Sequence, residues 1–151
     1  MRLDPRLVER LARARVVVDS EPLVRVHLPH WETKAVQRRA NRFHAPFCLT
    51  FEPDGVRVIC RETEWAQAGR GLHAIRVETG YRMITLDVEP HAEAADLLAT
   101  ITDLLQQKGI SVHPLPTFHR DRLLVHESRL EQTLRLLQDL QASDPQQGLP
   151  S

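Results

Sequence analysis

The sequence has no excess of charge of either sign and no long apolar run. Its 151 residues include 20 Lys plus Arg and 20 Asp plus Glu, so the formal net charge is zero. Bulk charge therefore indicates no polyanionic partner such as nucleic acid. No apolar segment approaches the ~18 residues that a membrane-spanning helix needs. Residues 1–15 alternate charged and apolar side chains, unlike the apolar core of a signal peptide. We expect a cytoplasmic protein with no nucleic-acid or membrane partner.

Motifs for metal binding and catalysis are also missing. The chain has eight histidines and two cysteines, but no Cys-x-x-Cys pair, no His-Glu-x-x-His helix and no carboxylate cluster at ligand spacing. It has no glycine-rich phosphate loop, no serine elbow and no activating base near either cysteine in the sequence. We therefore expect no catalytic residue, no metal and no cofactor, and the protein is not expected to be an enzyme.

The two cysteines lie in a predicted β-hairpin at residues 47–60. A four-residue turn places Leu49 opposite Val58 on the buried face, and Cys60 shares that face. Cys48 lies on the other face of the hairpin. Because side chains on opposite faces of a sheet cannot form a disulfide with normal geometry, both thiols are predicted to be free.

The most informative segment is 109–127, with the sequence GISVHPLPTFHRDRLLVHE. It follows a predicted amphipathic helix at 92–108, and Gly109 stands where a helix end needs a left-handed residue. The segment then predicts a strand, a Thr-Phe-x-x-Asp corner at 117–121 and a second strand at 123–125. A last helix should follow, with Ser128 as the first residue of a capping box.

The remaining chain predicts shorter elements. We expect helices at 4–15 and 31–43, strands at 16–18, 23–28, 72–77 and 81–88, and a turn at 78–80. Residues 62–71 are polar and contain glycine, so they are predicted to be a connection. After the last helix no further strand remains in the sequence. The C-terminal sheet should therefore take a fourth strand from elsewhere, either a strand of the first half such as 23–28 or a strand of another subunit.

The pattern of helix, Gly-Ile-Ser strand, Thr-aromatic-x-x-Asp corner and Leu-Leu-Val strand resembles the ACT domains. It is similar in particular to the tandem ACT group, which includes bacterial two-ACT proteins and the animal cytosolic arginine sensors. The resemblance implies an α+β fold of two ferredoxin-like ACT half-domains of βαββαβ type, with antiparallel sheets, helices on one face and a degenerate first half. The expected organisation is an N-terminal helix and strand extension at 1–21, a degenerate ACT-like half at 22–80, an ACT domain at 81–141 and a flexible tail at 142–151.

The resemblance also implies an effector site between ACT units. Asp121 would pair with the ammonium or guanidinium group of a ligand, because a charge-assisted hydrogen bond supplies both strength and direction. The ligand-binding residues implied in this way are Asp121, Thr117, Phe118, Ile110, Ser111, Asp96 and Glu93. From the residues alone, Asp121 is equally a turn-capping aspartate whose side chain accepts hydrogen bonds from nearby backbone amides.

Two functions are therefore expected. The first is a non-catalytic regulatory protein, a homodimer, that binds a small molecule such as an amino acid and signals through its dimer or a protein partner. The alternative is an ACT-fold assembly module with a vestigial effector site, which would use exposed apolar side chains at Ile59, Leu136 and Leu140. Asp96 bears on this choice, because the family usually has glycine at the helix entrance.

Overall fold

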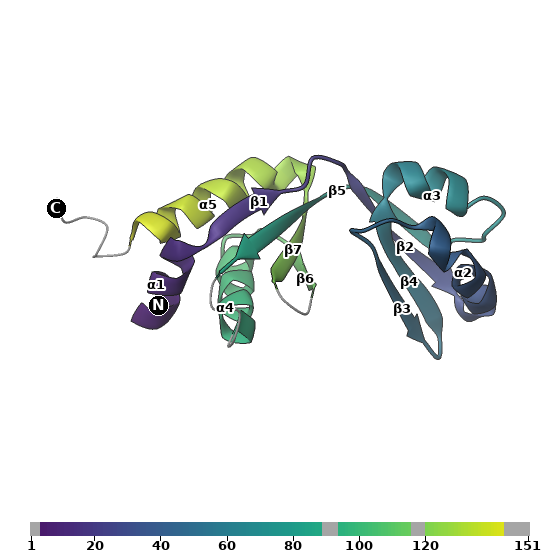
Figure 1. The fold of residues 1–151 in the computed structure, drawn as a ribbon, viewed down its shortest axis with the longest axis horizontal. Coiled ribbons are helices and arrows are strands. Elements are labelled where there is room, and N and C mark those ends of the chain that lie inside the picture. Colours follow the sequence, from purple (N-terminus) through teal and green to yellow (C-terminus); the bar gives the residue numbers. More distant parts are fainter. Residues whose placement is uncertain (1–3, 89–93, 116–119, 144–151) are drawn as a thin grey trace. The chain divides into compact units, whose positions relative to one another are not determined.

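The computed structural model describes residues 4–88, 94–115 and 120–143 (Figure 1). The chain divides into two compact units, Ser20–Tyr81 and Met1–Asp19 with Arg82–Ser151. We call the first the middle unit and the second the terminal unit. None of the helices in the described ranges is long and apolar enough to cross a membrane.

The middle unit contains a complete βαββαβ order of elements. These are β2 (Leu23–Pro29), α2 (Thr33–Arg39), β3 (Cys48–Glu52), β4 (Gly55–Arg61), α3 (Glu62–Ala68) and the first part of β5 (Arg76–Asp87), with short 3-10 turns at His30–Glu32 and Ala40–Arg42 flanking α2. The strands lie in the order β3-β4-β2-β5, and each neighbouring pair is antiparallel. The middle unit, which covers most of the half expected to be degenerate, therefore contains every element of this order.

Both helices of the middle unit pack on one face of its strands (Figure 1). Val36 of α2 and Ala68 of α3 lie in the same buried cluster as Val26 and Val58. The predicted hairpin register is confirmed, because Leu49 pairs with Val58. Both cysteines are free, as the strand geometry predicted.

Two predictions for this part of the chain were wrong. Residues 62–71 contain the helix α3, which is short and mostly polar but buries Ala68 at its end. Residues 78–80 do not form a turn, because β5 runs without interruption from Arg76 to Asp87. Gly80 has φ of +79°, and the register between β2 and β5 shifts between Leu23 and Arg25, so the glycine accommodates a bulge.

The terminal unit is assembled from both ends of the chain. Its elements are α1 (Pro5–Arg13), β1 (Arg15–Val18), the second part of β5, α4 (Ala94–Gln107), β6 (Val112–Leu115), β7 (Asp121–His126), a 3-10 turn at Glu127–Arg129 and α5 (Leu130–Ala142). The strand order is β6-β7-β5-β1. The pairing of β6 with β7 is antiparallel, as predicted.

The fourth strand of the terminal unit is β1, an earlier part of the same chain, and not the strand at 23–28 that was given as the example. Residues 15–18 pair antiparallel with residues 84–87 of β5. β2 is already committed to β4 and β5 in the middle unit. The segment expected to be an N-terminal extension, 1–21, thus includes a strand that completes the sheet of the terminal unit.

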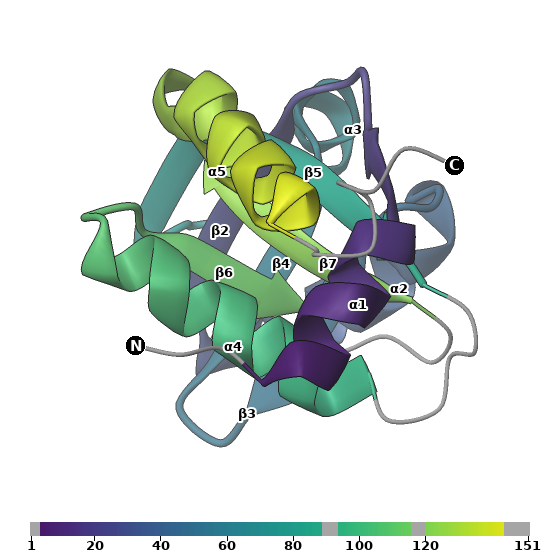
Figure 2. The same cartoon turned by 90° about the vertical axis from the view of Figure 1, so that its left-hand side faces the viewer.

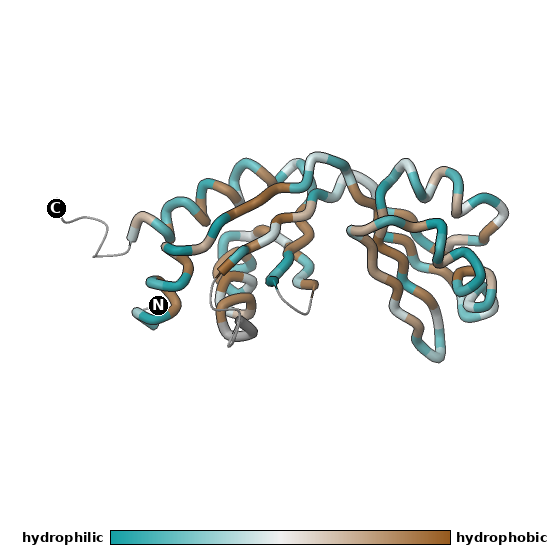
Figure 3. Tube along the Cα trace, viewed as in Figure 1, coloured by the Kyte–Doolittle hydropathy of each residue, from teal (hydrophilic) through white to brown (hydrophobic). Residues whose placement is uncertain are grey.

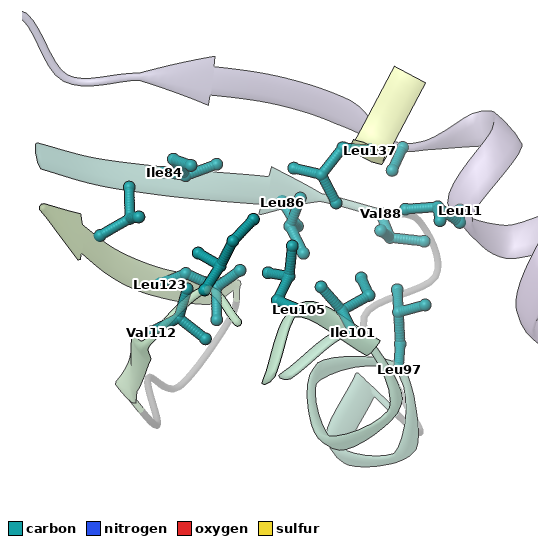
Figure 4. Close-up of a cluster of buried hydrophobic side chains, with 13 residues drawn as sticks. Leu11, Ile84, Leu86, Val88, Leu97, Ile101, Leu105, Val112, Leu123 and Leu137 are labelled. Carbon is teal, nitrogen blue, oxygen red and sulfur yellow. The ribbon is translucent and has the colours of Figure 1, made fainter. Parts of the chain in front are cut away.

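Three helices cover one face of the terminal sheet, and Figure 2 shows α1, α4 and α5 in front of its strands. Their buried side chains converge on alternate residues of the strands (Figure 4). Leu11 of α1, Ile101 of α4 and Leu137 of α5 meet Leu86 of β5 and Leu123 of β7 in this cluster. Because α1 contributes a buried leucine, it belongs to the core of this unit.

The sequence predicted the C-terminal end of α4 correctly but not the N-terminal end of α5. Gly109 has φ of +76°, as expected, and the amides of Gly109 and Ile110 donate to Gln106 and Leu105 at 2.9 Å each, which closes α4 with a Schellman motif. The capping box at Ser128 was wrong. A 3-10 turn precedes α5, and the amide of Ser128 donates to Nδ1 of His126 at 3.3 Å.

Candidate functional site

The predicted ligand carboxylate, Asp121, is largely buried at the start of β7. Its residue is 8% exposed. Burial raises the pKa of the Asp121 carboxyl, and the guanidinium of Arg10 in α1 partly offsets this effect. The Asp121 carboxyl is therefore desolvated and lies near the positive charge of Arg10.

An ion pair lies at the same end of the terminal unit. Nε of Arg120 is 3.1 Å from Oδ1 of Asp87, the last residue of β5. Arg15 of β1 is the cross-strand partner of Asp87. Since Arg120 immediately precedes Asp121, this end of the sheet combines two carboxylates with arginines from α1, β1 and the start of β7.

Only part of the predicted site is gathered at this end. β6 and β7 pair with Leu115 opposite Arg122 and Val112 opposite Val125. Ser111 immediately precedes β6 and therefore lies at the opposite end of the hairpin from Asp121. Five residues of strand separate Ser111 from Asp121 in register, which corresponds to about 16 Å. Ile110 is fully buried in the core. Within the terminal unit, one small ligand therefore cannot contact both Asp121 and the backbone at 110–111.

The other predicted residues are placed only in part. Asp96 lies in the first turn of α4. Thr117, Phe118 and Glu93 lie outside the described residues.

The middle unit contains a cavity that sequence reasoning missed. It has a volume of about 490 Å³ and is lined by Arg42, His44, Thr63, Glu64, Gln67 and Ala68. It was missed because its floor is α3, which had been predicted to be a connection. The available signal was the acidic Glu62-Thr63-Glu64 sequence, which is common in the first turn of a helix.

Glu64 is the best-defined polar group of this cavity. Its side chain is 13% exposed. Oε2 accepts a hydrogen bond from the amide of His44 at 2.6 Å and lies 3.2 Å from Nδ1 of the same residue. Oε1 is buried, accepts no hydrogen bond from the residues the structure describes, and lies 3.9 Å from Nη1 of Arg61. One carboxylate oxygen is thus held by His44 and the other faces Arg61, while Arg42 adds a positive charge to the lining of the same cavity.

The terminal unit has a more apolar groove of about 370 Å³ between β1 and α5. It is lined by Val16, Val18, Leu134, Leu137, Gln138 and Gln141. β1 is the edge strand of its sheet and is apolar over most of its length (Figure 3). The side-chain amide of Gln141 closes one end by donating to the carbonyls of Leu11 and Ala14 at 3.0 and 2.9 Å.

The apolar side chains expected to mediate assembly are not exposed. Ile59 is 4% exposed, because β4 is flanked by β3 and β2. Leu136 and Leu140 are partly buried against the core of the terminal unit. In the described ranges, no group of three or more His, Cys, Asp or Glu side chains is arranged to hold a metal ion.

Comparisons with known proteins give structural neighbours without a sequence family. No family model matches the chain, and no curated protein matches it. Among solved structures, protein Atu0741 of Agobacterium tumefaciens has a TM-score of 0.69 at 19% identity, over 85% of this chain and 90% of that one. VC0802 of Vibrio cholerae, described as a protein of unknown function and possible transport protein, has a TM-score of 0.65 at 21% identity, over 90% and 96%.

A third neighbour has a described role. The regulatory subunit of aspartate kinase from Thermus thermophilus has a TM-score of 0.60 at 12% identity, over 83% of this chain and 97% of that one. At such identities the likeness concerns the fold. Together with the two four-stranded units, it shows that the chain has a mixed α+β, ferredoxin-like fold of the ACT type.

Proposed function

We propose that this protein is a non-catalytic regulatory protein that binds an amino acid through its ACT-type units. The observation that carries the proposal is the cavity of the middle unit, where Arg42 and Glu64 line one space. A free amino acid has a carboxylate and an ammonium group, and these two side chains offer one partner to each. The volume of about 490 Å³ falls within the usual range for small-molecule sites, roughly 300–1,000 Å³.

The geometry of Glu64 supports this assignment. Its Oε2 is fixed by the amide of His44, so the carboxylate is held in one orientation. Its Oε1 is buried and takes no hydrogen bond within the described chain. A ligand ammonium that reached the carboxylate would share Oε1 with Arg61, which lies 3.9 Å away, and would form a charge-assisted hydrogen bond, which is stronger than a neutral one. The similarity to regulatory subunits of aspartate kinase supports a regulatory role for a protein of this fold.

The site around Asp121 stays a second prediction for the same function. Its carboxylate is desolvated and near Arg10, so a ligand cation would have to compete with that arginine. Thr117, Phe118, Glu93 and Asp96 stay predicted contributors. A homodimer, a protein partner and a cytoplasmic location likewise stay predictions.

A thermal-shift screen with the twenty amino acids tests the proposal. A ligand at 100 times its dissociation constant adds roughly 2.7 kcal/mol to the free energy of unfolding. Arg42→Gln and Glu64→Gln should each abolish the shift if the cavity is the site, whereas Arg38→Gln, an exposed arginine of α2 outside the cavity, should retain it. Asp121→Ala should abolish the shift only if the terminal unit holds the ligand. No shift with any amino acid would contradict the proposal.

The alternative function is an assembly module, and the groove beside β1 favours it. An edge strand that is apolar and unpaired on one side invites association. Val17 of β1 is 41% exposed. If this function is correct, the amino-acid screen stays flat, the chain elutes as a dimer in size-exclusion chromatography, and Val17→Lys makes it monomeric.

A further inference from the structure

A row of basic side chains crosses the sheet of the middle unit on the face opposite its helices. The cross-strand partners are Thr50 with Arg57, Arg57 with His27, and His27 with Arg76, so one continuous row spans β3, β4, β2 and β5. Val26 and Val58, the strand neighbours of His27 and Arg57, lie in the core beneath the helices. Because side chains alternate along a strand, the row lies on the other face.

An adjacent row contains the carboxylate of Glu78, whose oxygens are already engaged, and Glu52 lies on the same face two residues after Thr50. Glu78 lies 3.8 Å from Arg25 and 3.2 Å from Arg76, and it accepts a hydrogen bond from the hydroxyl of Tyr81 at 3.0 Å. The guanidinium of Arg25 also lies over the ring of Tyr81 at 5.6 Å. Arg25 and Arg76 therefore share Glu78, and together with Arg57 they outnumber the carboxylates of Glu52 and Glu78, so positive charge remains in excess.

Arg57 is the residue that this arrangement leaves without a carboxylate. Its side chain is half-buried, and its Nε is buried without a hydrogen-bond partner among the described residues. A buried guanidinium donor that lacks an acceptor is costly, because protein groups do not replace the water it has lost. The cross-strand neighbours His27 and Thr50 supply an imidazole N–H and a hydroxyl, so donors surround Arg57 on both sides.

We propose that this face of the middle unit binds a phosphate group at Arg57, with Thr50 and His27 as further donors. A guanidinium presents a planar fork that matches two oxygens of a phosphate. A doubly charged anion also offsets the excess positive charge better than a single carboxylate does. The face offers only Tyr81 as an aromatic residue, and its hydroxyl is committed to Glu78. It therefore lacks the stacking platform that binds nucleic-acid bases, and the ligand is a small one.

The pKa of His27, which lies in this row, should report phosphate binding directly. Burial and the charges of Arg57, Arg25 and Arg76 lower the pKa of His27, while Glu78 opposes them. A bound phosphate adds negative charge next to the ring and favours the imidazolium form. Binding of phosphate should therefore raise the pKa of His27.

Titration of the full-length protein with inorganic phosphate, followed by NMR of the His27 ring protons, tests the proposal. We expect saturable shifts and a higher pKa for His27 in phosphate than in chloride at equal ionic strength. Arg57→Gln should weaken binding by at least about tenfold, since it removes charge-assisted hydrogen bonds. Arg38→Gln is the matched control and should bind phosphate like the wild type.

Shifts that grow linearly with phosphate, or that are equal in Arg57→Gln, would overturn the proposal. If Arg57→Gln does not fold, the pKa of His27 in the wild-type protein tests the proposal instead. Equal pKa values in phosphate and in chloride would exclude a phosphate site at Arg57. A phosphomonoester such as glycerol 3-phosphate distinguishes the ligand source. Tighter binding than phosphate indicates a phosphorylated metabolite, and equal binding indicates the free ion. The result is independent of amino-acid binding, because Arg42→Gln should leave phosphate binding unchanged.

Discussion

Cys60 shows how position controls chemistry at the scale of one residue. It is fully buried in the core of the middle unit. Burial, together with the nearby charge of Glu64, raises the pKa of the Cys60 thiol from an ordinary 9.0 to about 12. The thiolate is the reactive form of cysteine, so this thiol should be chemically inert in the folded protein.

Alkylation at pH 8 should therefore modify Cys48 and leave Cys60 intact, and both should react in urea. Mass spectrometry after treatment with N-ethylmaleimide measures this, and Cys48→Ser is the control that should abolish native labelling. The raised pKa of Cys60 also predicts that the folded protein loses stability above about pH 9, because the unfolded chain releases the thiol proton at a lower pH than the folded chain does. Cys60→Ala should remove that loss. Rapid native labelling of Cys60 would contradict the buried position.

Asp121 is the residue whose role the sequence left open. Burial raises its pKa above the ordinary 3.8. A carboxyl with a raised pKa in the folded state contributes stability at low pH that is lost as the pH rises through that pKa. The ionised form is therefore the less favourable one in the folded protein.

Asp121→Asn should accordingly raise the melting temperature at pH 7, and the difference from wild type should shrink below about pH 4. Differential scanning fluorimetry across this pH range measures it, with the exposed Asp139→Asn as control. A lower melting temperature for Asp121→Asn at pH 7 would instead indicate a capping aspartate whose charged form accepts backbone hydrogen bonds.

At the scale of elements, β1 has the largest effect for its length. Its four residues pair with β5 and supply the fourth strand of the terminal sheet. Val16 and Val18 pack against the core of that unit, whereas Val17 points away from it. The strand therefore has an inner and an outer face that can be tested separately.

Val18→Asp should lower the free energy of unfolding by about 2 kcal/mol or more, because it loses apolar burial and places a charge against the core. Val17→Asp is the matched control on the outer face and should change it by no more than about 0.5 kcal/mol. Urea denaturation measures both. Equal effects of the two substitutions would show that β1 does not hold the register with β5 described above.

At the scale of the whole molecule, sequence order and spatial order differ. The middle unit is continuous in sequence, whereas the terminal unit combines residues 1–19 with residues 82–151. A fragment that begins near residue 80 lacks both α1 and β1. Such a fragment exposes the edge of β5 and part of the core, which favours aggregation.

Fragment 80–151 should therefore be insoluble or unfolded. A permuted chain, in which a flexible linker joins residue 151 to residue 1 and the sequence runs from 82 through 151 to 19, should fold. Fragment 20–81 should fold as well, because it contains its complete set of strands. Dispersed amide spectra identify the folded species. A folded 80–151 fragment, or an unfolded permuted chain, would refute the assignment of β1.

The sequence by itself determined what depends on local patterns. The apolar period of α4, the glycine at 109 and the β3–β4 register are set by neighbouring residues, and all three were predicted. Only the tertiary structure decided the rest. The partner of β1 lies more than sixty residues away, α3 is helical because Ala68 packs in a core, and the row around Arg57 exists only when four strands are aligned. Pairing between distant segments follows from burial and strand geometry in the folded chain, and no local pattern encodes it.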